Sequence, residues 1–127
     1  MEERNKIIII IDNKEITGNS YNCEENEKEV ELFIKKRIKD FSDMFYKCEY
    51  LYNIKELKYL DVSNGNNFSW MFYECNKLQN IDGLCNWNVS NGNNFSFMFF
   101  YCNQLQNIDG LSNWNVSNGN NFSCMFY

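Results

Sequence analysis

Apolar side chains return along most of the chain at a fixed step of 27 residues. The step holds for six columns of equivalent positions, so what repeats is a whole 27-residue structural unit and not a single residue type. Self-similarity at a period of roughly 20–50 residues is typical of solenoids and other repeat arrays. The columns are Phe41/Phe68/Phe95/Phe122, Met44/Met71/Met98/Met125, Phe45/Phe72/Phe99/Phe126, Cys48/Cys75/Cys102, Leu51/Leu78/Leu105 and Ile54/Ile81/Ile108.

This period divides the chain into two regions. Residues 1–40 form an N-terminal segment without the repeat, and residues 41–127 form the repeat region. The repeat region contains three full units, 41–67, 68–94 and 95–121, and a partial fourth unit, 122–127.

Each unit begins with a helical pattern. Phe68, Met71, Phe72 and Cys75 are spaced i, i+3, i+4 and i+7, which predicts a short helix with one buried face. Asn67 comes just before, where its side chain can accept hydrogen bonds from the first turn.

The second half of each unit has apolar residues at steps of three. This spacing predicts a short strand near Gln79–Asp82 and a second extended piece near Trp87–Ser90. Asp82-Gly83 and Asn91-Gly92 are predicted turns, because Gly and Asn tolerate positive φ.

The N-terminal segment has two strand-like runs, Lys6–Asp12 and Glu29–Arg37, on either side of the polar stretch Asn13–Lys28. Two strands that pair over the first coil would cover its apolar end. The sequence therefore predicts an α/β repeat: a right-handed solenoid with one short helix and one short parallel strand per coil, and an N-terminal β cap.

Three phrases resemble the repeat of the BspA-like surface proteins, a branch of the leucine-rich-repeat superfamily. The resemblance covers residues 41–127. It departs at Gly65, Gly92 and Gly119, where the family often has Val, and at Phe68, Phe95 and Phe122, where it prefers Met. It implies a leucine-rich-repeat-like solenoid, a role in adhesion or protein binding at the cell surface, and no catalytic residue. The phrases are Met71-Phe72-Tyr73-Glu74-Cys75, Leu78-x-x-Ile81 and Trp87-Asn88-Val89-Ser90-Asn91.

Charge and hydropathy exclude some partners. The net charge is −5, and the only basic patch is Lys35-Lys36-Arg37, which we interpret as a solvated strand edge. Nucleic acid is therefore not an expected partner, because phosphate binding needs clustered cations. The apolar run Ile7–Ile11 is too short to span a membrane, which needs roughly 20 residues. Lack of a signal peptide favours the cytoplasm and the family resemblance favours the cell surface, so the compartment stays open.

Residues capable of catalysis are scarce. The chain has no histidine, no glycine-rich phosphate loop and no inward carboxylate pair, so we expect neither a catalytic site nor a cofactor. Cys48, Cys75 and Cys102 are one coil apart, which favours buried thiols over a metal site. Cys23, Cys85 and Cys124 lie outside the column, and a pair among them would form only in an oxidising compartment.

The tryptophans and the asparagines of the N-x-S phrases are not predicted to bind sugars or to carry glycans. Trp87 and Trp114 belong to the apolar framework, so core stacking is favoured over contact with sugars. Five asparagines begin N-x-S glycosylation signals, which we interpret as chance products of a sequence rich in Asn and Ser. They are Asn67, Asn88, Asn94, Asn115 and Asn121.

Positions that differ between units are candidates for binding. Flanking the predicted strand, they would line the concave face that solenoids use for protein partners or surface glycans. The rival interpretation is a recently duplicated structural array without a ligand, because the second and third units are nearly identical. The face comprises Tyr52, Asn53, Lys55, Gln79, Asn80, Asp82, Gln106, Asn107 and Asp109, and the set Lys47/Glu74/Tyr101 also lies outside the core.

The last residues, Phe122–Tyr127, cannot cover the apolar end of the third unit. We expect that Trp114 and Val116 are exposed there. Continuation of the native chain, end-to-end self-association and fraying of the last unit are the three expected outcomes, in that order.

Overall fold

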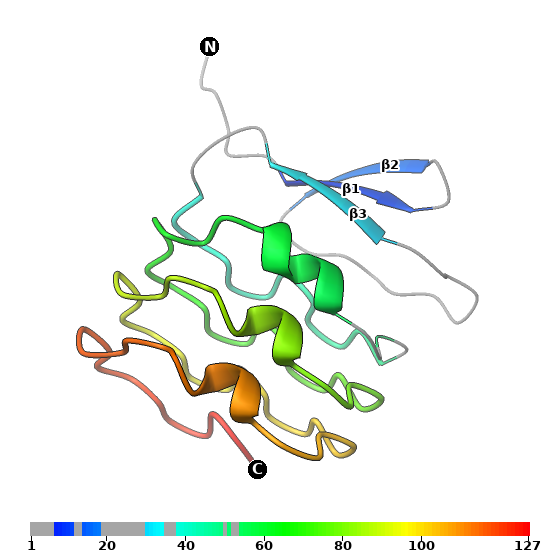
Figure 1. The fold of residues 1–127 in the computed structure, drawn as a ribbon. Coiled ribbons are helices and arrows are strands. Elements are labelled where there is room, and N and C mark those ends of the chain that lie inside the picture. Colours follow the sequence, from blue (N-terminus) through cyan, green and yellow to red (C-terminus); the bar gives the residue numbers. More distant parts are fainter. Residues whose placement is uncertain (1–6, 12–13, 19–29, 35–37, 50, 52–53) are drawn as a thin grey trace.

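The computed structural model describes residues 7–11, 14–18, 30–34, 38–49, 51 and 54–127. Three β-strands precede three short 3-10 helices in these residues (Figure 1). The strands are β1 (Ile7–Ile11), β2 (Lys14–Gly18) and β3 (Val30–Ile34). The 3-10 helices are η1 (Lys55–Tyr59), η2 (Asp82–Leu84) and η3 (Asp109–Leu111).

The N-terminal strands form an antiparallel sheet in the order β2-β1-β3. Ile9 in the central strand pairs with Ile16 of β2 and with Leu32 of β3. A run of five isoleucines favours this extended backbone, because β-branched side chains suit strands. The two predicted strands are confirmed over β1 and β3. The sequence pattern did not predict β2, which lies in the polar stretch.

Beyond the sheet, the chain winds through coils that stack on one another (Figure 1). Every second N–H at the start of a unit donates to a carbonyl 26 residues further on, in the next coil. Because these bonds cross between coils, each coil completes the backbone hydrogen bonding of its neighbour. In the second unit, the bonds run from Phe68 to Asn94 (2.8 Å), Trp70 to Ser96 (2.9 Å), Phe72 to Met98 (2.9 Å) and Glu74 to Phe100 (2.8 Å).

Parallel pairing occurs at single bridges rather than in strands. Three bridges form a column just before the start of each unit, Asp40 with Asn67, Asn67 with Asn94, and Asn94 with Asn121, and another joins Phe99 to Phe126 inside the last units. The predicted strand near Gln79–Asp82 is wrong, because Asp82 begins η2. Residues Trp87–Val89 have no assigned secondary structure and Ser90 is in a turn, so the extended piece predicted there stays a prediction.

The predicted helix over Phe68–Cys75 is also wrong. This segment is a series of tight turns, in which the N–H of Cys75 donates to the carbonyl three residues earlier, on Phe72. Trp70 and Glu74 have φ values of 62° and 55°. Positive φ lies outside the right-handed helical region and is typical of the third residue of a type II turn.

The turns nevertheless bury the residues that the pattern selected. The side chains of Phe68, Met71, Phe72 and Cys75 are fully buried. Consecutive turns can therefore reproduce the i, i+3, i+4, i+7 spacing of a helix, and the pattern identified the core residues but not the backbone.

The core is built from columns of stacked rings. Phe41, Phe68, Phe95 and Phe122 stack in order, with ring centroids 5.5, 5.4 and 5.3 Å apart. A parallel column runs from Phe45 through Phe72 and Phe99 to Phe126, with centroids 5.5 Å apart at each step. All the rings of these columns except Phe122 and Phe126 at the end are shielded from water, so their burial is a main source of cohesion between coils.

The predicted turn at Asn91-Gly92 is confirmed by the hydrogen bond from the N–H of Gly92 to the carbonyl of Val89 at 2.8 Å, whereas Asp82-Gly83 is part of η2. Positive φ is not the reason for either glycine, because no described glycine has positive φ. A Cβ at Gly92 would lie 2.4 Å from Cζ of Phe95, and one at Gly83 would lie 2.3 Å from the carbonyl oxygen of Ile54. Gly92 makes room for a core ring, and Gly83 lets η2 approach the preceding coil.

The two ends of the stack differ in exposure. At the N-terminal end, where Figure 1 shows the sheet, Ile54 of the first coil is only 4% exposed. The equivalent Ile108 in the third coil is 48% exposed. Val116 is exposed as predicted. Trp114 is half-buried instead, because it stacks on Trp87 with centroids 6.2 Å apart.

Candidate functional site

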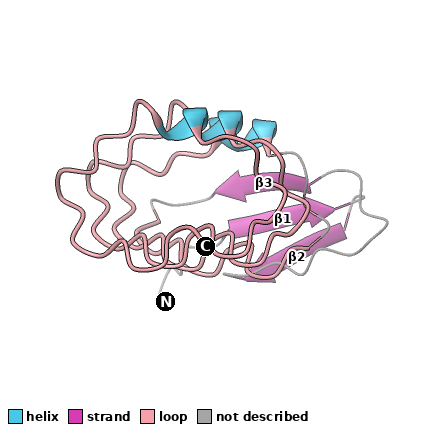
Figure 2. Cartoon of the chain, turned by 90° about the horizontal axis from the view of Figure 1, so that it is seen from below, coloured by secondary structure: helices cyan, strands magenta, loops and turns pink. Residues whose placement is uncertain are grey.

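The predicted binding face lies on the side of the stack that carries the 3-10 helices. Viewed along the stack, the helices form a row at one edge (Figure 2). Lys55, Asp82 and Asp109 each begin one of them and are exposed. Gln79, Asn80, Gln106 and Asn107 are exposed just before η2 and η3, whereas Tyr52 and Asn53 fall outside the described residues.

Several polar groups of this face are already bonded to one another. Asn80 Oδ1 accepts from the N–H of Asp82 at 2.7 Å, and Asn107 Oδ1 accepts from the N–H of Asp109 at 3.2 Å. Gln79 Nε2 donates to Gln104 Oε1 at 3.4 Å. The face therefore offers short polar groups that partly satisfy each other, and Tyr59 at the end of η1 is an exposed aromatic side chain beside them.

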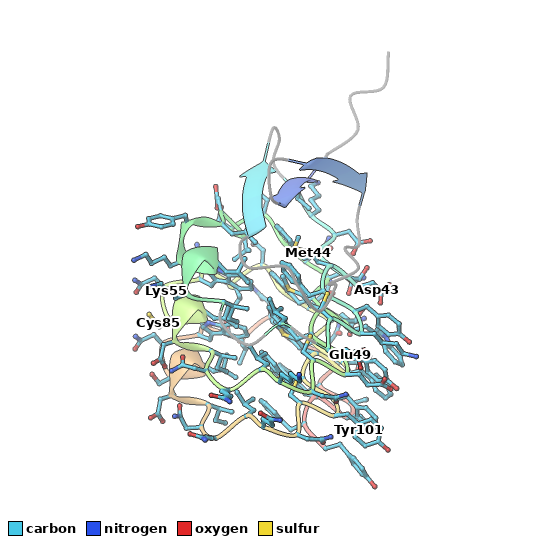
Figure 3. All side chains as sticks on the ribbon, turned by 90° about the vertical axis from the view of Figure 1, so that its right-hand side faces the viewer. Asp43, Met44, Glu49, Lys55, Cys85 and Tyr101 are labelled. Carbon is cyan, nitrogen blue, oxygen red and sulfur yellow. The ribbon has the colours of Figure 1, made fainter. Side chains whose placement is uncertain are left out.

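A second surface lies over the tight turns and was not predicted from the sequence. It consists of aromatic side chains outside the core columns, which we call the aromatic ladder. Figure 3 places Tyr101, one of its members, opposite Lys55 and Cys85. The ladder comprises Tyr46, Trp70, Tyr73, Phe97, Phe100, Tyr101 and Tyr127.

The ladder rings stack along the coils and cover each other's faces. Tyr73 lies between Tyr46 and Phe100, with centroids 5.0 and 5.3 Å away and interplanar angles of 9° and 2°. Trp70 stacks on Phe97 with centroids 4.2 Å apart. These five rings are half-buried, whereas Tyr101 and Tyr127 are exposed. In Tyr73, which is covered on both faces, the exposed parts are the ring edge and the phenolic tip.

Carboxylates border the ladder. Asp43 occupies, one coil earlier, the column of Trp70 and Phe97, and Figure 3 places Glu49 on the same side. Desolvation and then the charge of Asp40 raise the pKa of Asp43 above its usual value. For Tyr73, desolvation comes first and its hydrogen bond with Glu74 second among the causes that raise the phenol pKa.

One cation already contacts the ladder. The Nζ of Lys47 lies 5.4 Å from the ring centroid of Tyr46, within the range of a cation–π interaction. Among the described residues, no ion pair joins Lys47 to Asp43, Glu49 or Glu74.

Comparison with known sequences assigns the chain to a family. Residues 14–127 match the family described as "Mycoplasma protein of unknown function, DUF285". The chain belongs to this family. The match includes β2, β3 and every repeat unit, so both regions of the DUF285 chain are covered. No curated protein and no solved structure matched the chain.

The cysteine column of this DUF285 chain lies in the core. Cys48 and Cys75 are fully buried and Cys102 is 8% exposed. The Sγ atoms of Cys75 and Cys102 donate to the carbonyls of Phe45 and Phe72, both at 3.2 Å. Burial raises the pKa of the Cys75 thiol well above its usual value and that of Cys102 to about 12. These thiols stay protonated and are poor nucleophiles at neutral pH.

The remaining cysteines and tryptophans are accounted for separately. Cys85 and Cys124 are thiols without a disulfide, and Cys23 lies outside the described residues. The indole N–H groups of Trp87 and Trp114 donate to the carbonyls of Leu57 (2.8 Å) and Leu84 (2.9 Å) in the preceding coil. Both tryptophans therefore belong to the core, as predicted.

The N-x-S phrases have a structural cause, so their interpretation as chance products is wrong. Asn67 Oδ1 accepts from the N–H of Ser69 at 3.0 Å and from its hydroxyl at 2.7 Å. The same N–H bond recurs at Asn88, Asn94, Asn115 and Asn121. At the equivalent position before the first unit, Asp40 Oδ1 accepts the same hydrogen bonds from the N–H and the hydroxyl of Ser42. The turn therefore requires a side-chain acceptor oxygen, which either Asp or Asn can supply.

Two kinds of site are absent from the described residues. No group of three or more His, Cys, Asp or Glu side chains is placed to hold a metal ion there. In the same part of the chain, no helix is long and apolar enough to cross a membrane. A shallow depression of about 340 Å³ lies at the last coil, where Ile108 and Phe126 are exposed and Gln106 and Asn107 reach its wall.

Proposed function

We propose that the chain is a non-enzymatic binding module, a right-handed leucine-rich-repeat-like solenoid similar to the BspA-like surface proteins, that binds a protein partner. The hydrogen bonds and parallel bridges between successive coils support the solenoid. The backbone departs from the regular repeat by its 3-10 helices and by tight turns in place of the helix predicted at the start of each unit.

The departures from the BspA-like sequence pattern are physically linked. The ring of Phe68 lies where a Cβ on Gly65 would be, with Cζ at 2.5 Å. A family member with Val at the first position therefore needs a side chain other than Phe at the second, and Met fits. The paired change to Gly and Phe agrees with one common architecture.

The aromatic ladder is the observation that carries the binding function. Trp and Tyr dominate the energetics of protein interfaces, because they bury large areas at small conformational cost. On the side of the 3-10 helices the exposed aromatic side chain among the described residues is Tyr59, at the end of η1, whereas the ladder offers a whole column of them. Sugars bind by stacking on aromatic faces, and both faces of Tyr73 and Phe100 in the ladder are covered, so the ladder favours a protein over a glycan.

The second candidate is a structural array without a ligand. The near identity of residues 79–97 and 106–124 supports recent duplication. A structural array would bury its aromatic residues between coils and needs no half-exposed column, which is why we favour the binding module.

Site-specific photocrosslinking in the native cell separates the two. A photoreactive residue replaces Tyr101 on the ladder, Gln79 on the polar face, or Ser112 as an exposed control. The binding module predicts a discrete adduct from position 101 that excess unlabelled chain abolishes, and none from position 112. An adduct from position 79 alone would move the site to the polar face. No adduct from either face would favour the array.

A further inference from the structure

The aromatic ladder presents apolar ring edges next to acidic groups. Its tyrosines add phenolic oxygens at the tips, and Tyr101 and Tyr127 are 39% and 80% exposed. A ligand that fits must combine apolar length with positive charge. Lys and Arg side chains do so, because their methylene stems cover apolar surface while the charged head remains solvated.

We propose that the aromatic ladder binds a polypeptide segment rich in Lys or Arg, which places its stems across the ring edges and its charged groups near Asp43, Glu49 and Glu74. This inference rests on the proposed binding function and specifies the class of partner.

Charge complementarity supports this class. Among the described residues of the segments that carry the ladder, 38–49, 68–77 and 95–104, Asp40, Asp43, Glu49 and Glu74 are acidic, whereas Lys39, Lys47 and Lys77 are basic. An acidic peptide or a nucleic acid would meet net repulsion here. Lys47 provides an internal example, since its ammonium group already lies over the Tyr46 ring at 5.4 Å.

Ring geometry decides against a binding mode that relies on stacking. Tyr73 and Phe100 each have a ring neighbour on both faces. A sugar or a nucleobase would have to separate a stacked pair before it could reach a face of Tyr73 or Phe100. A flexible basic segment can bind along the edges without disturbing the stack.

The test uses the full 127-residue chain and three flexible peptides of equal length. One alternates Lys with Ser and Leu, and its two counterparts carry Glu or Gln in place of Lys. Affinity is measured by calorimetry, and the position of binding by the NMR signal of the Trp70 indole. The indoles of Trp87 and Trp114 serve as internal controls, because both are bonded to carbonyls in the core.

Two double variants with the same change in charge provide the specificity control. Asp43→Asn/Glu49→Gln alters the border of the ladder, and Asn tolerates the positive φ of Asp43, which is 60°. Asp82→Asn/Asp109→Asn alters the opposite side. We expect Asp43→Asn/Glu49→Gln to lower the affinity for the Lys peptide by about three- to tenfold, the range for loss of two exposed charge pairs. The second pair should leave the affinity within about twofold.

Salt dependence adds a second readout. Binding should weaken between about 0.01 M and 0.15 M salt, where the screening length falls from about 30 to 8 Å. A shift of the Trp70 indole signal should accompany binding.

Three results would overturn the inference: equal binding of the Glu or Gln peptide, an unchanged affinity in Asp43→Asn/Glu49→Gln, or no binding of any peptide. If an adduct from Tyr101 still forms in the cell, the binding module stands and only the class of partner is wrong.

Discussion

The contact between Gly92 and Phe95 makes the packing of the units measurable. A methyl group at Gly92 would lie 2.4 and 3.0 Å from two atoms of the Phe95 ring and 2.9 Å from the carbonyl oxygen of Val89. Phe95 is fully buried between Phe68 and Phe122, so its ring cannot move aside. We expect Gly92→Ala to destabilise the fold by about 2–3 kcal/mol, the upper part of the range for overpacked cores.

Removal of the ring should relieve most of that cost. Phe95→Met alone loses two stacked neighbours and should itself cost about 1–3 kcal/mol. In Gly92→Ala/Phe95→Met, the two ring contacts disappear and only the contact with Val89 remains. The double variant should therefore be more stable than the sum of the single variants predicts, by about 1–2 kcal/mol.

Urea denaturation of the wild type, both single variants and the double variant provides the coupling energy. Gly83→Ala/Phe95→Met is the matched control, because a Cβ at Gly83 meets the backbone of Ile54 and Lys55 and not a ring. In the control pair, the changes in the free energy of unfolding of the two single variants should add to that of the double variant within about 0.5 kcal/mol. Additivity in the Gly92 pair as well would refute the assigned contact.

Four further outcomes are expected. Cys75→Ala should destabilise by about 1–2 kcal/mol through a small cavity, and zinc chelators should leave the wild-type unfolding curve unchanged; a chelator-induced transition would contradict a structural role. Burial raises the pKa of the Cys102 thiol from 9.0 to about 12. As the pH rises, the unfolded chain therefore loses this proton before the folded chain does. The contribution of Cys102 to the free energy of unfolding is constant below about pH 9 and is lost between about pH 9 and pH 12. Cys102→Ala should flatten that part of the stability profile, and an unchanged slope would contradict the shift. Glu74→Gly should stabilise by about 0.5–1 kcal/mol relative to Glu74→Ala, because φ is 55° at this position, whereas Asn76→Gly should not stabilise relative to Asn76→Ala. Sedimentation of the 127-residue chain should show concentration-dependent self-association through the exposed Ile108, Phe122 and Phe126, and Ile108→Lys should reduce it; a concentration-independent monomer would count against an end-to-end contact.

The core could be predicted from the sequence because burial leaves a periodic trace. The columns of Phe68, Met71, Phe72 and Cys75 are apolar in every unit, and all four residues are fully buried. β1 and β3 could also be predicted, since runs of β-branched and apolar residues favour strands. β2 could not, because Lys14–Gly18 reads as polar and its extended form depends on pairing with β1.

The backbone of the units could not be predicted for a different reason. Positive φ at Trp70 and Glu74 has no signature in the sequence, because neither residue prefers it. The conformation is held by hydrogen bonds to the next coil, such as that from Glu74 N–H to Phe100 at 2.8 Å. Tertiary contacts thus override a local pattern that reads as a helix.

The sequence pattern pointed to positions that vary between units, and the face they form stays a prediction. One column of the ladder keeps its aromatic character instead, Tyr46, Tyr73, Phe100 and Tyr127, whereas Trp70, Phe97 and Tyr101 lie in columns that vary. The available signal was an aromatic column outside the i, i+3, i+4, i+7 set, since a purely structural repeat has no need for one there.

The most direct test of the stacked coils is an NMR measurement of scalar couplings across hydrogen bonds. The account predicts couplings from the amide nitrogens of Phe68, Trp70 and Phe72 to the carbonyl carbons of Asn94, Ser96 and Met98. Couplings from Phe72, Tyr73 and Cys75 to carbonyls four residues earlier, with helical carbon shifts over residues 68–75, would contradict it.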